Sequence, residues 1–394
     1  MLNKLYLDID VYEAAKRRME TTFDDFKHVY LAFSAGKDSG AMLNLALDVA
    51  RAKRRLPLDV MIVDLEAQYQ KTVEFIERVA NHPDVKLYWC CLPIAMRNGV
   101  SQFQSSWTCW HPEQKEQWTR KLPKDPSVIA DEDYFPFYQR GMRFDAFVNG
   151  FGEWFSAQHA NEPCACMIAI RSAESLNRHR TIVSTTKSRW KDYPWTTQAS
   201  DSVYKVYPLY DWTADDIWIA NAEFGWDYNK TYDLMHLAGV PKHKMRLCQP
   251  FGNDQRQGLW LFKILEPDTW SKVVNRVQGA NFGNRHAMDC GNMMGNVRIA
   301  LPQGHTWKSY TKLLLASTPP DLAQHYRHEI IQSLKRWKKA VRNNAGAAKK
   351  CVPDWRRAAK VILSYDYHCK GLNFVEADRA KNQTLNLIAK YKEL

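Results

Sequence analysis

Short apolar runs alternate with segments of helical periodicity in the first quarter of the chain. The runs at 29–33, 59–64 and 85–92 have the length of buried strands. The segments 40–55 and 70–79 between them carry apolar residues at helical spacing, and a further helix is expected over 2–26. This alternation predicts an α/β fold, with a parallel sheet and helices on both faces.

The turn between the first predicted strand and the next helix reads Ser34-Ala35-Gly36-Lys37-Asp38-Ser39. A strand, a tight turn and a helix direct backbone N–H groups and the positive end of the helix dipole at one point, which suits a phosphate. Ser34 and Ser39 can donate from their hydroxyls, and Lys37 adds a positive charge. Asp38 can hold a metal ion or order the loop. We expect the loop to be exposed; the alternative is a connecting turn that binds nothing.

This pattern differs from the Walker loop, which requires Gly-x-x-x-x-Gly-Lys-Ser/Thr. It resembles the PP-loop of the ATP pyrophosphatase and phosphoadenosine-phosphosulfate (PAPS) reductase superfamily, which usually reads Ser-Gly-Gly-x-Asp-Ser. Ala35 stands in the place of the first of those glycines. The resemblance covers about residues 25–260 and implies a sheet of the adenine nucleotide α-hydrolase type.

Two acidic residues follow the second predicted strand, Asp64 and Glu66. Ligands of such sheets bind beyond the carboxyl ends of the strands, so both residues are expected beside the phosphate loop. One of them can meet a ribose hydroxyl, an adenine amine or a metal ion. The alternative is that Asp64 caps the next helix.

A later strand, predicted over 164–170, is followed by Arg171, Glu174 and Arg178. Two guanidinium groups with a carboxylate between them suit a clamp for phosphate or sulfate. PAPS reductases carry a similar Arg-x-x-Glu-Ser-x-x-Arg after a central strand, so the resemblance implies that these residues bind the nucleotide. A salt-bridged surface helix is the alternative.

Further segments extend the resemblance and divide the chain. Residues 207–218 resemble the family's Pro-Leu-x-x-Trp-x-x-x-Asp-Ile-Trp segment, with Thr213 as the expected N-cap. Residues 246–256 and 301–310 resemble a narrower group, the PAPS-reductase-like proteins with a C-terminal domain of unknown function, of the immunoglobulin-binding regulator A type. This narrower resemblance implies a ParB-like protein partner.

The domain organisation follows from the same segments. We expect a PP-loop domain over 1–260, with an aromatic insertion or lid at about 96–138, and a mostly helical, basic domain over 261–394. In the second domain, basic residues surround Trp337 and Trp355, within 335–342 and 349–360. Such a pattern suits the backbone of DNA or RNA, and a solvated helical face is the alternative.

Composition agrees with an anionic ligand. The chain has 55 Lys and Arg against 43 Asp and Glu, so its net charge is +12. No signal peptide and no apolar stretch of membrane-spanning length is present, so we expect a cytoplasmic protein, no membrane contact and nine reduced cysteines.

The cysteines argue against sulfate reduction. The resemblance implies that a PAPS reductase carries its nucleophilic thiol in a C-terminal Glu-Cys-Gly-x-His segment. The nearest match here, Asp289-Cys290-Gly291-Asn292, lies well before the end of the chain and lacks the His. Cysteines 90, 91, 109, 164 and 166 could converge on a metal, but buried apolar packing is their commoner role.

The resemblance therefore implies ATP, or a related adenine nucleotide, and Mg²⁺ as ligands. The expected chemistry is adenylation: attack on the α-phosphate with departure of pyrophosphate. Lys37, Asp38 and Arg171 are the candidate catalytic residues, and Asp38 is the candidate metal ligand. Sulfur transfer from a phosphosulfate-type nucleotide, and a nucleotide-sensing regulator that acts on nucleic acid through its partner, are the alternatives.

Overall fold

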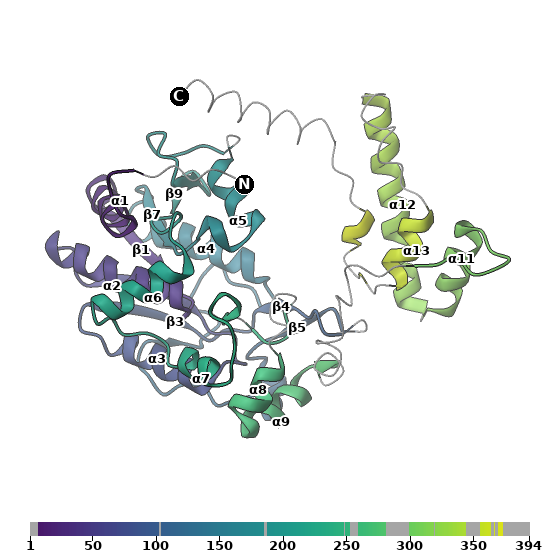
Figure 1. Cartoon of the computed structure of the whole chain (residues 1–394), viewed down its shortest axis with the longest axis horizontal. Coiled ribbons are helices and arrows are strands. Elements are labelled where there is room, and N and C mark those ends of the chain that lie inside the picture. The colour runs from purple at the N-terminus through teal and green to yellow at the C-terminus, as the bar shows by residue number, and fades with distance from the viewer. Residues whose placement is uncertain are drawn as a thin grey trace. The chain divides into compact units, whose positions relative to one another are not determined.

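The computed structural model describes residues 7–101, 104–184, 187–247, 249–252, 259–280, 299–318, 320–343, 355–363, 366 and 369–372. The chain forms two compact units (Figure 1). The first comprises residues 1–100 and 106–281, and the second comprises residues 101–105 and 282–394. The boundary predicted at residue 260 falls inside helix α8 (Leu259–Leu265) of the first unit.

A seven-stranded sheet forms the centre of the first unit. Its order is β6 (Val128–Ile129), β3 (Val85–Cys90), β2 (Leu58–Val63), β1 (His28–Ala32), β7 (Cys164–Ile168), β9 (Val203–Val206) and β8 (Thr196–Gln198). All neighbouring pairs are parallel except β8 and β9. The predicted α/β class is therefore confirmed.

Helices pack on both faces of this sheet. Tyr30 of β1 contacts Phe151 and Phe155 of α4 (Phe144–Ala157), whereas Phe33, just beyond the strand, contacts Phe75 of α3 (Gln70–Ala80). Residues three apart in extended chain point to opposite faces. The two aromatic clusters therefore fill opposite sides of the central strand.

Local capping sets the ends of several helices. The first helix, α1 (Val11–Asp25), begins later than position 2, because the Asp10 side chain accepts a 2.8 Å bond from the Glu13 N–H. Helix α6 (Ala214–Glu223) begins at the predicted N-cap, where Thr213 and Asp216 form a capping box. Helix α2 (Lys37–Ala52) begins within the phosphate loop, directly after Gly36.

Apart from residues 101–105, the aromatic segment predicted as an insertion belongs to the first unit. It contains the antiparallel pair β4 (Ala95–Arg97) and β5 (Ser106–Thr108), the 3-10 helix η1 (Pro112–Gln117) and strand β6. Trp107 and Trp110 are buried in the core. The segment therefore contributes to the core as well as covering the end of the sheet.

The remaining described elements of the first unit follow β7. They are η2 (Ser172–Glu174), α5 (Leu176–Val183), α7 (Thr231–Leu237), η3 (Lys242–Lys244), α8 and α9 (Pro267–Arg276). Leu259 and Phe262 of α8 and Val273 of α9 belong to the same buried cluster as the sheet. These two helices are thus part of the first unit's core.

The second unit is helical, as predicted, in its described part. It contains α11 (Trp307–Ser317), α12 (Pro320–Asn343), α13 (Trp355–Leu363) and η6 (Lys370–Leu372). These elements share a core of their own, which includes Leu315, Tyr326, Ile330 and Ile362. Within the described ranges, no helix is both long enough and apolar enough to cross a bilayer.

Candidate nucleotide site

The phosphate loop is a tight turn held by its own hydroxyls. Ala35 adopts φ = 54°, in the left-handed region that glycine tolerates best. The Ser34 N–H donates to Ser39 Oγ over 3.2 Å, the two hydroxyl oxygens lie 3.0 Å apart, and the Ser39 hydroxyl donates to the Gly36 carbonyl over 3.1 Å. The positive φ explains why the family's motif has glycine where this chain has Ala35.

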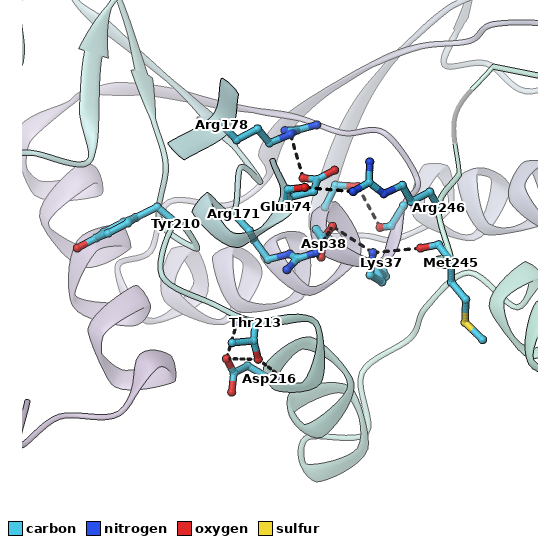
Figure 2. A network of polar contacts seen from close by, with 12 residues as sticks. Lys37, Asp38, Arg171, Glu174, Arg178, Tyr210, Thr213, Asp216, Met245 and Arg246 are labelled. Atoms are coloured by element: carbon cyan, nitrogen blue, oxygen red, sulfur yellow. Dashed lines mark hydrogen bonds and ion pairs between the residues drawn. The ribbon is translucent and has the colours of Figure 1, made fainter. Parts of the chain in front are cut away.

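Residues of the segment 229–245 also hold the phosphate loop in place. The Asn229 amide donates to the Ala35 carbonyl over 2.8 Å, and the Tyr232 hydroxyl accepts the Lys37 N–H over 3.0 Å. Lys37 Nζ lies 3.4 Å from the Met245 carbonyl and 3.4 Å from Asp38 Oδ2 (Figure 2). The loop is thus braced between α2 and a later part of the chain.

The expectation of an exposed loop is wrong for Lys37 and Ser39, although Ser34 at the start of the loop is exposed. Lys37 is 6% exposed and Ser39 is 3% exposed. Tyr232 and Met245 lie against Lys37, which explains its burial. Substitutions in this loop therefore have a cost in fold stability as well as in binding.

Arg171 and Asp38 form an ion pair beside the phosphate loop. Arg171 follows β7, and its Nε donates to Asp38 Oδ1 over 2.7 Å, with Nη2 at 3.4 Å from Oδ2. Arg171 is 5% exposed, so this pair is largely shielded from water. Figure 2 shows Asp38 with Lys37 on one side and Arg171 on the other. Two cations therefore meet one carboxylate at the first turn of α2.

A second group of charges lies in the same network. Arg178 Nε pairs with Glu174 Oε2 at 2.9 Å, and Arg246 Nη2 donates to the Glu174 carbonyl over 3.2 Å (Figure 2). Arg246 is exposed and the side chain of Arg178 is 40% exposed, in contrast to the buried Arg171. Arg171 and Arg178 thus lie in one network, each paired with a carboxylate.

Asp64 is fully buried and engaged by protein groups. Its carboxylate accepts from Trp89 Nε1 at 2.8 Å and from Glu66 N–H at 2.9 Å, and it pairs with Arg120. The N-cap position of helix α3 is Tyr69, so Asp64 does not cap this helix. Asp64 closes the turn after β2 and fixes Arg120 of the aromatic segment.

Glu66 is buried to the same degree. Its carboxylate receives both Nε (2.7 Å) and Nη2 (3.0 Å) of Arg276 from α9, and the N–H groups of Trp110 and Thr119. Arg276 itself is buried, with its guanidinium 5.1 Å from the Trp107 ring centroid. A direct nucleotide contact by Asp64 or Glu66 stays a prediction, since protein donors already meet both carboxylates.

Residues 28–236 match the family described as the phosphoadenosine phosphosulfate reductase domain. The chain belongs to this reductase-domain family. Residues 239–350 match a domain of unknown function, DUF3440. The predicted resemblance to PAPS reductases with a C-terminal domain of unknown function is thereby confirmed.

One relative of this PAPS reductase-domain protein matches it almost from end to end. It is the uncharacterized protein YbdN of Escherichia coli K12, which is 39% identical and matches over 97% of this chain and 95% of its own length. Subunit 2 of sulfate adenylyltransferase from Photobacterium profundum is 25% identical over 49% of this chain. The chain spans 56% of that subunit's length, so only part of the subunit has a counterpart here.

The chain also shows similarity to two solved structures from Candida species. The FMN adenylyltransferase of Candida glabrata is 15% identical, with a TM-score of 0.35, covering 56% of this chain and 57% of that one. The PAPS reductase of Candida auris, in a phosphate complex, is 14% identical, with a TM-score of 0.30, covering 59% of this chain and 94% of that one.

The described cysteines of the PAPS reductase-domain protein are buried and free. Burial raises the pKa of Cys109 to about 12, that of Cys164 to about 12 and that of Cys166 to about 11. Among the described residues, no group of three or more His, Cys, Asp and Glu is placed to hold a metal. Cys290 lies outside the described residues. The described thiols are thus packing groups.

Four residues of the site went unnoticed in the sequence: Asn229, Tyr232, Met245 and Arg246. Tyr232 acts through the contact of its hydroxyl to the Lys37 N–H, which leaves no motif in the sequence. Met245 acts through its backbone carbonyl, which any residue could supply. Arg246 is the one member with a readable signal, because it opens the segment 246–256 shared with the narrower group, and an arginine there is a candidate for anion binding.

Proposed function

We propose that this protein binds an adenine nucleotide, with ATP as the best candidate, at the loop formed by residues 34–39. The observation that carries the proposal is the convergence of Lys37 and Arg171 on Asp38 at the first turn of α2. The first N–H groups of a helix have no partner within it, and its dipole adds positive potential there. The Lys37 N–H already donates to the Tyr232 hydroxyl. The site therefore offers a polyphosphate two buried cations and the positive end of the helix dipole.

The chemistry that we infer is adenylation. An acceptor atom forms a bond to the α-phosphorus while the bond from that phosphorus to the bridging oxygen of pyrophosphate breaks. Negative charge then grows on the departing pyrophosphate. Lys37 and Arg171 are positioned to neutralise it, and preorganised charges of this kind act without reorganisation in the transition state. No residue is assigned as a general base.

Mg²⁺ fits this site as a ligand that arrives with the nucleotide. Asp38 is the carboxylate between Lys37 and Arg171. Mg²⁺ commonly combines one or two carboxylates with phosphate oxygens and water. When bound, the ion would supply positive charge across the phosphates, with Asp38 as its protein ligand. Lys37 and Arg171 hold that carboxylate oriented meanwhile.

Arg178 and Arg246 extend the positive surface outward from the loop. Their guanidinium groups flank Glu174 in the same network. A second anionic group, on the nucleotide or on the acceptor, could compete with the Glu174 contacts for these donors. We assign Arg246, which lies outside the part matched by the reductase domain, to this outer anion-binding role.

Sulfur transfer from a phosphosulfate-type nucleotide is the second candidate. It requires an ionised thiol that attacks sulfur. The six described cysteines are buried, and burial raises the pKa of each of them. Adenylation needs no thiol. The burial of those cysteines therefore favours adenylation.

A non-enzymatic sensor that works with a ParB-like protein is the third candidate. It shares the nucleotide site but predicts binding without turnover. A ParB-like partner stays a prediction from the narrower resemblance.

Calorimetric titration with ATP and Mg²⁺ tests the proposed site. Lys37→Ala should weaken binding by about 1.5–3 kcal/mol, roughly 10- to 150-fold, because a charge-assisted hydrogen bond is lost. Ser39→Ala should also weaken ATP binding. Lys121→Ala, at an exposed lysine away from the loop, is the matched control. Thermal unfolding of each variant separates loss of fold from loss of binding, and unchanged affinity in both loop variants would exclude this site.

The products distinguish the three candidates. ATP labelled at the α-phosphate should yield AMP or an adenylated acceptor, together with pyrophosphate, if adenylation is right. Formation of adenosine 3′,5′-bisphosphate or sulfite from phosphoadenosine phosphosulfate would support sulfur transfer instead. Stable binding with neither product supports the sensor.

A further inference from the structure

The positive charge of the chain is concentrated in its C-terminal part. Residues 299–372 contain fourteen Lys and Arg against four Asp and Glu, which accounts for ten of the net +12 charges. The like charges of this region repel one another, and their summed field attracts an anionic partner over large distances. Charge alone does not identify that partner; the placement of the aromatic residues does.

Helices α11 and α13 meet near their first turns. The Thr311 hydroxyl, one turn into α11, donates to the Trp355 carbonyl at the start of α13 over 3.0 Å. Lys308 Nζ lies 5.9 Å from the Trp355 ring centroid. Reciprocally, Arg356 Cζ lies 5.7 Å from the Trp307 ring centroid. We call these four side chains (Trp307, Lys308, Trp355 and Arg356) the tryptophan–cation face.

This face is not explained by the packing of the second unit. The hydrophobic core of the second unit consists of other residues, such as Leu315, Tyr326 and Ile362. Trp355 is 37% exposed, and Lys308 and Arg356 are exposed. Within the part of the chain that the structure describes, neither of these two cations has a carboxylate in ion-pair contact. The face thus presents aromatic rings and uncompensated positive charge to solvent.

We propose that the tryptophan–cation face binds single-stranded nucleic acid. Each component has a counterpart in the ligand: the phosphates pair with Lys308 and Arg356, and unstacked bases stack on Trp355 and Trp307. A duplex keeps its base faces stacked inside, so only a single strand can use the rings. An anionic membrane or an acidic protein would satisfy the charges but has no planar bases to cover the indoles. This inference does not depend on the proposed nucleotide chemistry of the first unit.

The test measures binding of the full-length chain to a fluorescein-labelled 20-nucleotide oligo(dT) by polarisation, over a series of salt concentrations. Wild type should bind it more tightly than a 20-base-pair duplex, and the affinity should fall steeply with salt. Trp355→Ala should lower the affinity about tenfold, the scale of one lost base stack, whereas Trp355→Phe should retain most of it. Lys308→Gln with Arg356→Gln should reduce the slope of log affinity against log salt by about 1.4, or 0.7 for each phosphate contact.

The matched control removes two charges elsewhere. Lys121→Gln with Lys124→Gln replaces two exposed lysines of the first unit and should leave the slope unchanged. Circular dichroism and ATP titration on every variant show that the fold and the nucleotide site are intact, so failure of the two proposals can be told apart.

Three results would overturn the inference. The first is wild-type binding that does not depend on salt, or no binding at all. The second is equal affinity for oligo(dT), for the duplex and for inorganic polyphosphate of similar length, since stacking would then contribute nothing. The third is binding to phosphatidylglycerol vesicles without binding to oligo(dT).

Discussion

Arg171 donates its Nε–H to the Asp38 carboxylate over 2.7 Å, which joins the end of β7 to the first turn of α2. The two residues are 133 positions apart in the chain, and Arg171 is almost completely buried. Asp38 also lies 3.4 Å from Lys37 Nζ. The free protein thus keeps its two buried cations oriented by one carboxylate, and an incoming polyphosphate must compete with that carboxylate for them.

Arg171→Lys should weaken ATP binding about tenfold or more. A lysine ammonium cannot reproduce the planar fork that lets Arg171 hold Asp38 and meet a phosphate in the same orientation. Calorimetry measures the change. Arg17→Lys is the control, because Arg17 makes an exposed pair with Glu13 on α1 and should behave like wild type. Equal ATP affinity for Arg171→Lys and wild type would reduce the Arg171–Asp38 pair to a structural salt bridge.

Ala35→Gly should be better tolerated than Ala41→Gly. Both alanines are buried, and both substitutions lose one methyl group and gain freedom in the unfolded chain. Only Ala35 has positive φ, where an L side chain costs about 1–2 kcal/mol that glycine avoids. Ala41 lies within α2, where glycine is unfavourable.

Urea unfolding of the two glycine variants measures this difference. We expect Ala35→Gly to be the more stable of the two by about 2–3 kcal/mol, of which about 1–2 kcal/mol is strain relieved at position 35 and about 1 kcal/mol is the cost of glycine within α2. Ala35→Gly should also retain ATP binding, because it restores the family's motif. Equal stability of the two variants would show that the left-handed turn is not strained.

The thiols give a test that separates adenylation from thiol chemistry. Burial raises the pKa of Cys164 and Cys109 to about 12 and that of Cys166 to about 11, so on the order of one thiol in a thousand or fewer is ionised at pH 8. The six buried cysteines should therefore react slowly with Ellman's reagent in the native protein: 90, 91, 109, 164, 166 and 369.

All nine cysteines should react at once in guanidinium chloride, which is the control for total thiol. Mass spectrometry locates the labelled positions. Fast native labelling of any of the six would contradict their assignment as packing residues and would reopen sulfur transfer.

Features set by neighbours in the sequence could be predicted, and features set by distant partners could not. The phosphate loop and the capping box of Thr213 and Asp216 are local patterns, and the sequence reveals both. Glu66 looks like a ligand residue because it follows a strand. Its partner Arg276 is 210 positions away, so no local pattern shows that the carboxylate is already paired.

The same reason explains the predicted domain boundary at 260. The resemblance to PAPS reductases ends at about residue 260, so the predicted boundary assigns α8 and α9 almost entirely to the second domain. Val273 and Arg276 nevertheless pack into the first unit. Whether a helix belongs to one core or another depends on contacts with residues far away in the chain, and Arg276 makes several of these.

Arg276→Met should destabilise the protein by about 3–5 kcal/mol. The substitution leaves the Glu66 carboxylate buried with its charge unpaired, and removing one partner of a buried pair has this scale of cost. Arg140→Met is the matched control. Arg140 pairs with Glu132 at 2.6 Å, but its side chain is 53% exposed, so its loss should change the stability little.

Glu66→Gln combined with Arg276→Met completes the design of this experiment. With both charges gone, part of the lost stability should return, because no charge is then buried alone. Urea unfolding, monitored by tryptophan fluorescence, measures the stability of four proteins: wild type, Arg276→Met, Arg140→Met and the double variant. If Arg276→Met costs no more than Arg140→Met, α9 is not anchored through Glu66, and the first unit does not depend on this part of the DUF3440 segment for its stability.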